Sequence, residues 1–183
     1  MSDISYDLVA TRFGYGAVVA GMAGVVEVFL PFGKDSAESA VAEVLQAYPD
    51  ALQGGGCARL AAEELESYCA GETVRFTAPL DLHRLTSFQL AVSRQVLTIG
   101  YGKVCSYGEV ARDVGSPKAA RGVGAVMAAN RLPILVPCHR VVAADGSLTG
   151  YSGCGGIDSK RILLQMEGVR FSAAGKVIVC DNS

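Results

Sequence analysis

The pattern of apolar positions near the N-terminus predicts β-strands. Valine-rich runs occupy residues 17–20 and 25–30, and the four residues between them begin and end with glycine. Two strand-forming runs on either side of a short glycine-containing segment are typical of a hairpin. A further β-branched and aromatic stretch, residues 74–78, predicts another short strand.

Between these predicted strands the apolar spacing is helical. Over residues 39–48 and 57–69, apolar side chains recur at steps of three and four, so each segment predicts a helix with one buried face. Gly71 is placed to end the second helix as a cap. Residues 81–85 are the expected connector to the second half of the chain.

The second half of the chain is expected to be mainly helical. Helical spacing of apolar residues begins at Ser87 and continues until Gly100 interrupts it. Ser106 and Glu109 have the spacing of a capping box, in which the serine caps a helix N-terminus and the glutamate reaches back to the cap. A second helix is therefore expected to begin at about this point.

A helix-turn-helix is predicted next. Gly115 breaks the short capped helix, and Ser116 and Pro117 are expected to start another helix over residues 118–129. Two short helices around a tight glycine-containing turn describe this motif, which binds DNA in some proteins and is only structural in others.

The expected helix over residues 118–129 consists mostly of alanine and glycine, and its charges are Lys118 and Arg121. A helix face made of small side chains allows either close packing against another helix or close approach to a nucleic-acid surface. Both interpretations remain open at this point, although glycine inside a helix costs up to ~1 kcal/mol relative to alanine.

Composition and charge narrow the class of protein. The chain has 183 residues, of which 50% are hydrophobic and 19% charged, as in one ordinary domain or two small ones. No apolar run approaches the ~18 residues of a membrane span, and the early acidic residues Asp3 and Asp7 argue against a secretory signal. We therefore expect a cytoplasmic protein without a membrane partner.

The net charge of −2 hides an asymmetry between the two halves. Residues 1–90 carry 5 Lys and Arg against 12 Asp and Glu, a balance of −7, whereas residues 91–183 carry 11 against 6, a balance of +5. This change of sign indicates two subdomains and is compatible with an anionic partner for the second one, although a solvated basic face would look similar.

The cysteines predict free thiols rather than a metal centre. None of the six forms a C-x-x-C pair, and the chain has only two histidines. A zinc site would have to combine distant residues such as Cys57, Cys69 and His83. Buried structural thiols in a reducing cytoplasm are the simpler interpretation, so no metal is expected.

The segment 133–142 carries the candidate chemistry. Cys138 is followed directly by His139 and Arg140, and adjacent residues point to different sides in a regular helix or strand. They cooperate only where the backbone is irregular, as Pro137 before the cysteine would favour. A cysteine beside cationic groups has a stabilised thiolate. The plain alternative is an apolar strand end with a buried cysteine.

The segment Pro-Cys-His-Arg-Val at 137–141 resembles the active-site signature of O6-alkylguanine-DNA alkyltransferases, also called methylated-DNA–protein-cysteine methyltransferases. The resemblance covers about 87–170 in unbroken order. The other matching positions are 101–104, 106–107, 117–121, Asn130, 150–153 and 163–168. The resemblance implies an α+β fold with a sheet-plus-helix N-terminal domain over 1–82, similar to ribonuclease H, and a DNA-binding, alkyl-accepting C-terminal domain over 83–183.

The resemblance also implies a role for each matching residue in a single-turnover repair reaction. Cys138 accepts the alkyl group from O6 of guanine, and His139, bridged to it by water and held by Glu167, takes the thiol proton. Tyr107 donates to the guanine ring, and Asn130 orders the turn around the cysteine. The product thioether is not reversed by ordinary reductants, so no cofactor is expected.

Because the family acts on DNA, the resemblance also implies which residues bind DNA and which form the substrate pocket. The target base must be flipped out of the duplex, and the resemblance places the helix at 118–129 in the minor groove of DNA that contains O6-alkylguanine, bound by a monomer. The implied DNA-binding residues are Lys118, Ala120, Arg121 and Tyr107, and the implied substrate-pocket residues are Met127, Val141, Tyr151 and Ser152.

The chain departs from the family pattern in two places. Val92 and Ser93 stand where a tryptophan is common, and the loop after Tyr151 is two residues longer than usual and contains Cys154. We expect the longer loop to admit bulky adducts and Cys154 to be dispensable for transfer. The alternative function is a lesion-recognition protein without repair activity, against which Cys138 argues. A thiol hydrolase fits poorly, because its cysteine and histidine normally come from separate segments.

Overall fold

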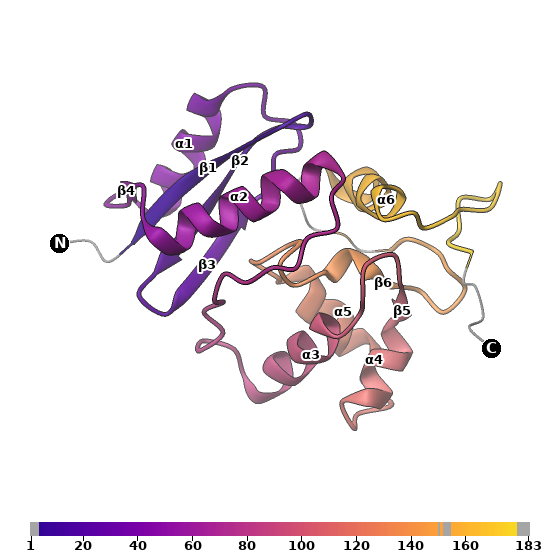
Figure 1. Ribbon diagram of the computed structural model, residues 1–183. Helices are drawn as coiled ribbons and strands as arrows, with labels where there is room; N and C mark the ends of the chain where they lie inside the picture. The colour runs from indigo at the N-terminus through magenta and orange to yellow at the C-terminus, as the bar shows by residue number, and fades with distance from the viewer. Residues whose placement is uncertain (1–3, 150, 152–154, 179–183) are drawn as a thin grey trace. The chain divides into compact units, whose positions relative to one another are not determined.

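The structure is a computed structural model that describes residues 4–149, 151 and 155–178 (Figure 1). The chain divides into two compact units, Met1–Arg84 and Leu85–Ser183. The first unit combines a sheet with helices and the second is mainly helical, which confirms the predicted α+β class. Within the described ranges, every helix is too short or too polar to cross a membrane.

The first unit is built on a four-stranded sheet in the order β3-β2-β1-β4. β1 pairs antiparallel with β2, and β2 with β3, whereas β4 lies parallel to β1. The strands are β1 (Ser5–Thr11), β2 (Gly14–Gly21), β3 (Gly24–Phe29) and β4 (Leu52–Gln53). The hairpin expected from residues 17–20 and 25–30 is confirmed as β2 and β3.

Two helices pack on this sheet, and α2 runs across it in Figure 1. They are α1 (Ala37–Ala47) and α2 (Gly56–Ala70), close to the predicted 39–48 and 57–69. Gly71 ends α2 with a φ of 100°, a left-handed conformation that glycine adopts without strain, so the predicted cap is confirmed. The apolar faces of β1, β2 and α1 meet in a core that includes Tyr6, Val19 and Val44.

Strand β1 was not predicted from the sequence. Its burial does not alternate cleanly, because Tyr6 and Val9 are buried while the residues between them are half-buried. Such a strand is recognised by its pairing with a neighbouring strand. Here β1 pairs with β2 at seven consecutive positions, from Ser5 opposite Ala20 to Thr11 opposite Gly14.

The prediction of a strand over residues 74–78 is wrong. The carboxylate of Glu64 in α2 accepts hydrogen bonds from the backbone N–H groups of Thr77 and Ala78, so this segment is held by a side chain instead of a neighbouring strand. Pairing with the sheet begins slightly later, where Leu80 forms an isolated bridge with Val25 of β3.

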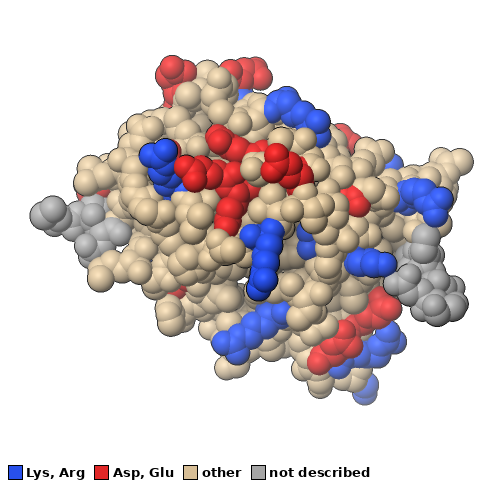
Figure 2. Space-filling model, in the orientation of Figure 1, with Lys and Arg blue, Asp and Glu red and all other residues tan. Residues whose placement is uncertain are grey.

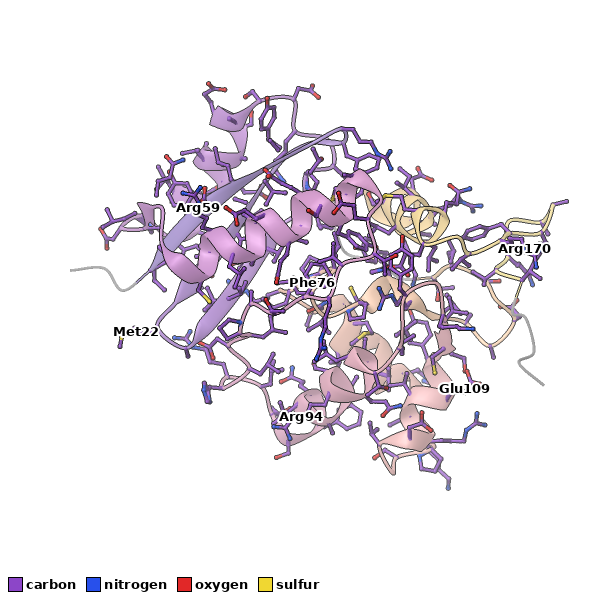
Figure 3. The ribbon with its side chains drawn as sticks, viewed as in Figure 1. Met22, Arg59, Phe76, Arg94, Glu109 and Arg170 are labelled. Atoms are coloured by element: carbon purple, nitrogen blue, oxygen red, sulfur yellow. The ribbon has the colours of Figure 1, made fainter. Side chains whose placement is uncertain are left out.

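The second unit consists of four helices, a single 3-10 turn and a pair of two-residue parallel strands in its described part. The helices are α3 (Ser87–Leu97), α4 (Tyr107–Asp113), α5 (Ala120–Ala128) and α6 (Gly156–Met166), the turn is η1 (Cys138–Arg140), and the strands are β5 (Cys105–Ser106) and β6 (Val141–Val142). The capping box predicted for Ser106 and Glu109 is confirmed at the start of α4 (Glu109 is labelled in Figure 3).

The predicted helix-turn-helix is formed by α4 and α5, which pack against each other. Gly115 turns the chain between them with a φ of 71°. The expected start of the second helix is wrong by two residues, because Ser116 does not cap it. The carbonyl of Ser116 instead accepts a hydrogen bond from the N–H of Ala119 (2.8 Å), and this separate turn precedes the first helical residue, Ala120.

Candidate active site and DNA-binding helices

The cysteine and the histidine lie in an irregular turn, as predicted. Residues 138–140 form one turn of 3-10 helix after Pro137, and the N–H of Cys138 donates to the carbonyl of Val136 (2.7 Å). This backbone directs both side chains into the unit: Cys138 is 4% exposed and His139 is fully buried. Two adjacent residues therefore reach one buried site, which neither a regular helix nor a strand would allow.

The segment before the turn is held by Asn130. Its side-chain N–H donates to the carbonyl of Val136 (2.9 Å), and its side-chain oxygen accepts from the N–H of Leu132 (3.0 Å). Ile134 lies inside this loop with a φ of +71°, the one positive value at a non-glycine residue in the described part of the chain. Such strain costs of order 1–3 kcal/mol and persists where the surroundings enforce it, often at functional sites.

Glu167 lies behind His139. The Nε2 atom of His139 is 2.9 Å from Oε1 of Glu167, and both side chains are completely buried. Because an ionised carboxylate only accepts hydrogen bonds, Nε2 carries the hydrogen and Nδ1 has an open lone pair for a proton. The structure therefore brings together an imidazole and a carboxylate that are separated by 28 residues in sequence.

Arg140 completes this cluster with its planar guanidinium. Its Nε donates to Oε2 of Glu167 (2.9 Å) and one terminal nitrogen donates to Oε1 (2.8 Å), a two-pronged geometry that suits a carboxylate. The other terminal nitrogen donates to the carbonyl of Ile99 (2.6 Å). Arg140 thus neutralises Glu167, whereas its position two residues after Cys138 in sequence indicates the cysteine as its target.

The electrostatics of the turn favour a neutral resting pair. Burial lowers the pKa of His139, so its imidazole is neutral at pH 7 and can accept a proton. Burial raises the pKa of the Cys138 thiol, while a hydrogen bond from Asn130 and the charge of Lys160 act in the opposite direction. Burial would also raise the pKa of Glu167, but hydrogen bonds from His139 and Arg140 lower it to about 2.

Tyr107, the first residue of α4, lies on another side of the site. Its hydroxyl donates to the carbonyl of Thr149 (3.1 Å). Burial raises the pKa of its hydroxyl. Ser106, the residue before α4, pairs with Val142 of β6, which directly follows the cysteine turn, so the start of the helix-turn-helix is joined to that turn.

The other predicted pocket residues are only partly placed. Val141 and Met127 are buried, and Tyr151 has a buried hydroxyl without a hydrogen-bond partner in the structure. Burial raises the pKa of Tyr151 far above its ordinary range, with a contribution from Cys138. Ser152 and Cys154 lie outside the described residues.

The predicted DNA-binding residues lie on the exposed part of the helix-turn-helix. Lys118 and Arg121 are exposed, as are Ala125 and Ala128 on α5, and Ala120 is half-buried. At Gly122 a small residue is needed for packing, because an added Cβ would come within 3.3 Å of the Phe88 side chain in α3. The interpretation as close helix packing therefore holds for Gly122, while the exposed alanines leave the outer face of α5 open to a partner.

Charge is distributed unevenly within the chain. Figure 2 shows acidic side chains gathered over α2 of the first unit, the helix that carries Glu63, Glu64 and Glu66. The exposed cations of α5 and the turn before it belong to the second unit. An anionic partner is therefore expected to contact the second unit.

Lys160 of α6 is a fully buried lysine that was not among the predicted site residues. Its ammonium donates to the carbonyl of Val141, the residue that follows the cysteine turn (2.6 Å). The signal was present in the spacing, because Lys160, Leu163, Leu164 and Glu167 follow one another at steps that place them on a single helix face. A lysine on an otherwise apolar face is easily taken for a solvated residue.

The chain is similar in sequence to proteins that repair methylated DNA. Residues 87–169 match the family model described as the 6-O-methylguanine DNA methyltransferase DNA-binding domain. A methylated-DNA–protein-cysteine methyltransferase of Mycobacterium tuberculosis is 50% identical over 113 residues, which are 62% of this chain and 67% of that protein.

Two solved structures extend the likeness to the first unit. The crystal structure of Mycobacterium tuberculosis O6-methylguanine methyltransferase has a TM-score of 0.72 at 35% identity, covering 93% of this chain and 96% of that one. The same organism's OGT in complex with DNA has a TM-score of 0.70 at 36% identity, covering 89% and 92%.

The fold and these relatives define a DNA-binding repair protein of mixed α+β architecture. More narrowly, the chain belongs to the methylated-DNA–protein-cysteine methyltransferase family. It is an enzyme of direct-reversal DNA repair that transfers methyl groups from DNA to protein cysteine.

Proposed function

We propose that this chain repairs O6-alkylguanine in double-stranded DNA by moving the alkyl group onto Cys138, once per molecule. The observation that carries the proposal is the buried turn in which Cys138 is followed by a histidine whose far nitrogen is held by Glu167. That arrangement provides a nucleophile, a neutral base and a carboxylate that orients the base.

The reaction balances without a cofactor. Nδ1 of His139 takes the thiol proton through a bridging water, and the sulfur attacks the alkyl carbon bound to O6. The carbon–sulfur bond forms as the carbon–oxygen bond breaks, and the electron pair stays on the guanine. Tyr107 donates a proton or hydrogen bond to the purine ring, which disperses the developing negative charge. The product thioether leaves Cys138 unable to react again.

Tyr107 must change partner during this reaction. Its hydroxyl is bound to the carbonyl of Thr149 in the structure, so it has to release that carbonyl before it can donate to a base.

DNA is proposed to bind along the exposed face of α5, in the minor groove. Ala125 and Ala128 are exposed and small, which lets the helix backbone approach the groove, and the exposed Arg121 is proposed to fill the space that the flipped guanine leaves in the stack. Because the minor-groove pattern is degenerate, little sequence preference is expected. One chain supplies the acceptor, the base and both DNA-binding helices, so we take the protein to act as a monomer.

The cytoplasm is the proposed location, because Cys57, Cys69, Cys105 and Cys138 are all free thiols, as a reducing compartment requires. A lesion-recognition protein without repair activity is not favoured, because Cys138 occupies the acceptor position beside its base.

Intact-mass spectrometry tests the proposal directly. We expect the protein, mixed with excess O6-methylguanine duplex oligonucleotide, to gain the mass of one methyl group per molecule, located on the peptide that contains Cys138. An unmodified oligonucleotide is the control. Methyl groups on another cysteine, or many lesions repaired per protein molecule, would contradict the proposal.

Replacing Arg121 by alanine separates base flipping from chemistry. Flipping costs a few kcal/mol, so losing the residue that fills the stack is expected to slow transfer from duplex DNA about tenfold or more. Reaction with free O6-benzylguanine should not change, since that substrate needs no flipping. Single-turnover rates on both substrates provide the measurement.

Arg94→Ala is the matched control, because Arg94 is an exposed arginine of α3 outside the helix-turn-helix (Figure 3). It should leave both rates nearly unchanged. Equal losses on the two substrates in the Arg121 variant would show that Arg121 does not act in flipping.

A further inference from the structure

Lys160 of α6 is buried although it is a lysine. Only 1% of it is exposed. Its ammonium donates to the carbonyl of Val141 (2.6 Å) and more weakly to the carbonyl of Thr149 (3.4 Å). Val141 is the first residue after the cysteine turn, and Thr149 also accepts the hydroxyl of Tyr107. A single cation thus joins the two backbone segments that flank the reacting cysteine.

This cation has no carboxylate partner in the described part of the chain. Its polar contacts are the two carbonyls, and its ammonium lies 5.8 Å from the centre of the Tyr107 ring. Lysine is almost never fully buried unless it is paired with an opposite charge, because removing a charge from water is costly. An apolar side chain of similar length would fill the same space without that cost, so packing alone does not account for a lysine here.

Among the described residues, Cys138 is the group that would balance the charge of Lys160, and it does so only as the thiolate. The ammonium is held at Val141, directly after the cysteine turn, and its positive charge acts to lower the pKa of the Cys138 thiol, so it favours the thiolate over the thiol. The other titratable groups near the pair are His139, whose protonation the same charge disfavours, and the phenols of Tyr107 and Tyr151, which are neutral at pH 7. The thiolate is therefore the counter-ion that the resting site lacks.

We propose that Lys160 is a positioning residue for alkyl transfer: its buried ammonium ties Val141 to Thr149 and stabilises the Cys138 thiolate as the thiol loses its proton. This inference rests on the proposal that Cys138 is the alkyl acceptor. The proton goes to His139, the positive charge of Lys160 stays in place throughout, and no bond to Lys160 forms or breaks.

Stabilisation of the thiolate by Lys160 is expected to depend on pH. Burial lowers the pKa of Lys160 to about 8, so its ammonium is charged below that pH and loses its proton above it. Stabilisation of the thiolate is therefore greatest below pH 8 and declines at higher pH. If Lys160 acted only by holding the two backbone segments together, the rate effect would not depend on pH in this way.

The test is the pH profile of Cys138 alkylation by free O6-benzylguanine in the Lys160→Met and Lys160→Gln variants of the full chain. Methionine removes both the charge and the hydrogen bonds, whereas glutamine keeps a donor without the charge. If the thiol pKa rises by about one unit, the rate near pH 7 falls about tenfold. In both variants the loss should shrink as the pH rises above 8. Lys160→Arg, which keeps the charge, should recover part of the rate.

Lys176→Met is the matched control, because Lys176 is a half-exposed lysine of the same unit paired with Asp145. Thermal unfolding of each variant shows whether the fold is kept. An unchanged pH profile in folded Lys160→Met would overturn the inference, as would a loss of rate that is equal at every pH. If the unaltered protein itself fails to alkylate Cys138, the proposed function fails instead, so the two outcomes are distinguishable.

Discussion

The Cys138→Ala variant is expected to accept no methyl group from O6-methylguanine DNA, although it should still bind that DNA. Removing the sulfur removes the proposed acceptor of the alkyl carbon, the thiol that directly precedes His139 in the buried turn. Alanine leaves a small gap at a buried position, so we expect a loss of stability of about 1–2 kcal/mol. Mass spectrometry of the protein and repair of the oligonucleotide measure transfer, and a gel-shift assay measures binding.

Cys105→Ala is the matched control for this variant. Cys105 is a half-buried free thiol in the same unit, and its pKa is raised to about 11 by burial and by the nearby carboxylate of Glu109. A thiol of that kind is almost entirely protonated at pH 7 and is a poor nucleophile. Transfer should therefore proceed normally in Cys105→Ala. Methylation that persists in Cys138→Ala would require a different acceptor and would refute the assignment.

The Glu167→Gln variant is expected to lose both stability and rate. Glu167 accepts hydrogen bonds from His139, Arg140 and the N–H of Gly102, and its side chain is completely buried. Removing one charge of a buried pair leaves Arg140 without compensation, which costs about 3–5 kcal/mol of unfolding free energy. His139 loses the group that orients it and supports its protonated form, and a general base contributes about 10²- to 10⁴-fold.

Denaturant unfolding and single-turnover transfer at pH 7 measure the two losses. Asp145→Asn is the matched control, because Asp145 pairs with Lys176 at the surface with 57% of its side chain exposed. A surface ion pair of this kind contributes little, so neither stability nor transfer should change much. If Glu167→Gln kept the stability and rate of the unaltered protein, the buried cluster would have no part in the reaction.

The same variant has a characteristic pH dependence. The pKa of Glu167 is lowered to about 2 in the folded chain, against about 4.3 in an unfolded one. Its contribution to stability is therefore complete above about pH 4.3 and is lost as the pH falls towards 2. The stability difference between the unaltered protein and Glu167→Gln should shrink over that acidic range.

Several features of the second unit followed from local sequence alone. Ser106 and Glu109 cap α4 through hydrogen bonds between residues three positions apart, so their spacing is sufficient evidence. The irregular turn at Cys138 follows from Pro137 and from the need of adjacent residues to reach one site. The resemblance added the roles of His139, Glu167 and Tyr107, and the likeness of residues 1–82 to ribonuclease H stays a prediction.

Features that depend on contacts with residues far away in sequence could not be predicted from local sequence. β1 exists because β2 pairs with it, and residues 74–78 are held by the Glu64 carboxylate of α2 rather than by a strand. Ser116 has the right residue type and position for a helix cap, but its carbonyl closes a separate turn instead. For residues 74–78 and for Ser116, a tertiary or backbone contact overrode the local preference, whereas for β1 the partner strand supplied structure that local sequence did not indicate.

By itself, then, the sequence determined helices α1 to α5, the hairpin of β2 and β3 and the turn that carries Cys138, because each depends on residues a few positions apart; α6 was not predicted. Only the tertiary structure decided which charges meet at that turn. Arg140 follows the cysteine in sequence yet binds Glu167, while Lys160, 22 positions further along (160 − 138), supplies the positive charge that reaches the sulfur. Coulomb interactions in a buried site depend on distance in space and on burial, and sequence separation specifies neither.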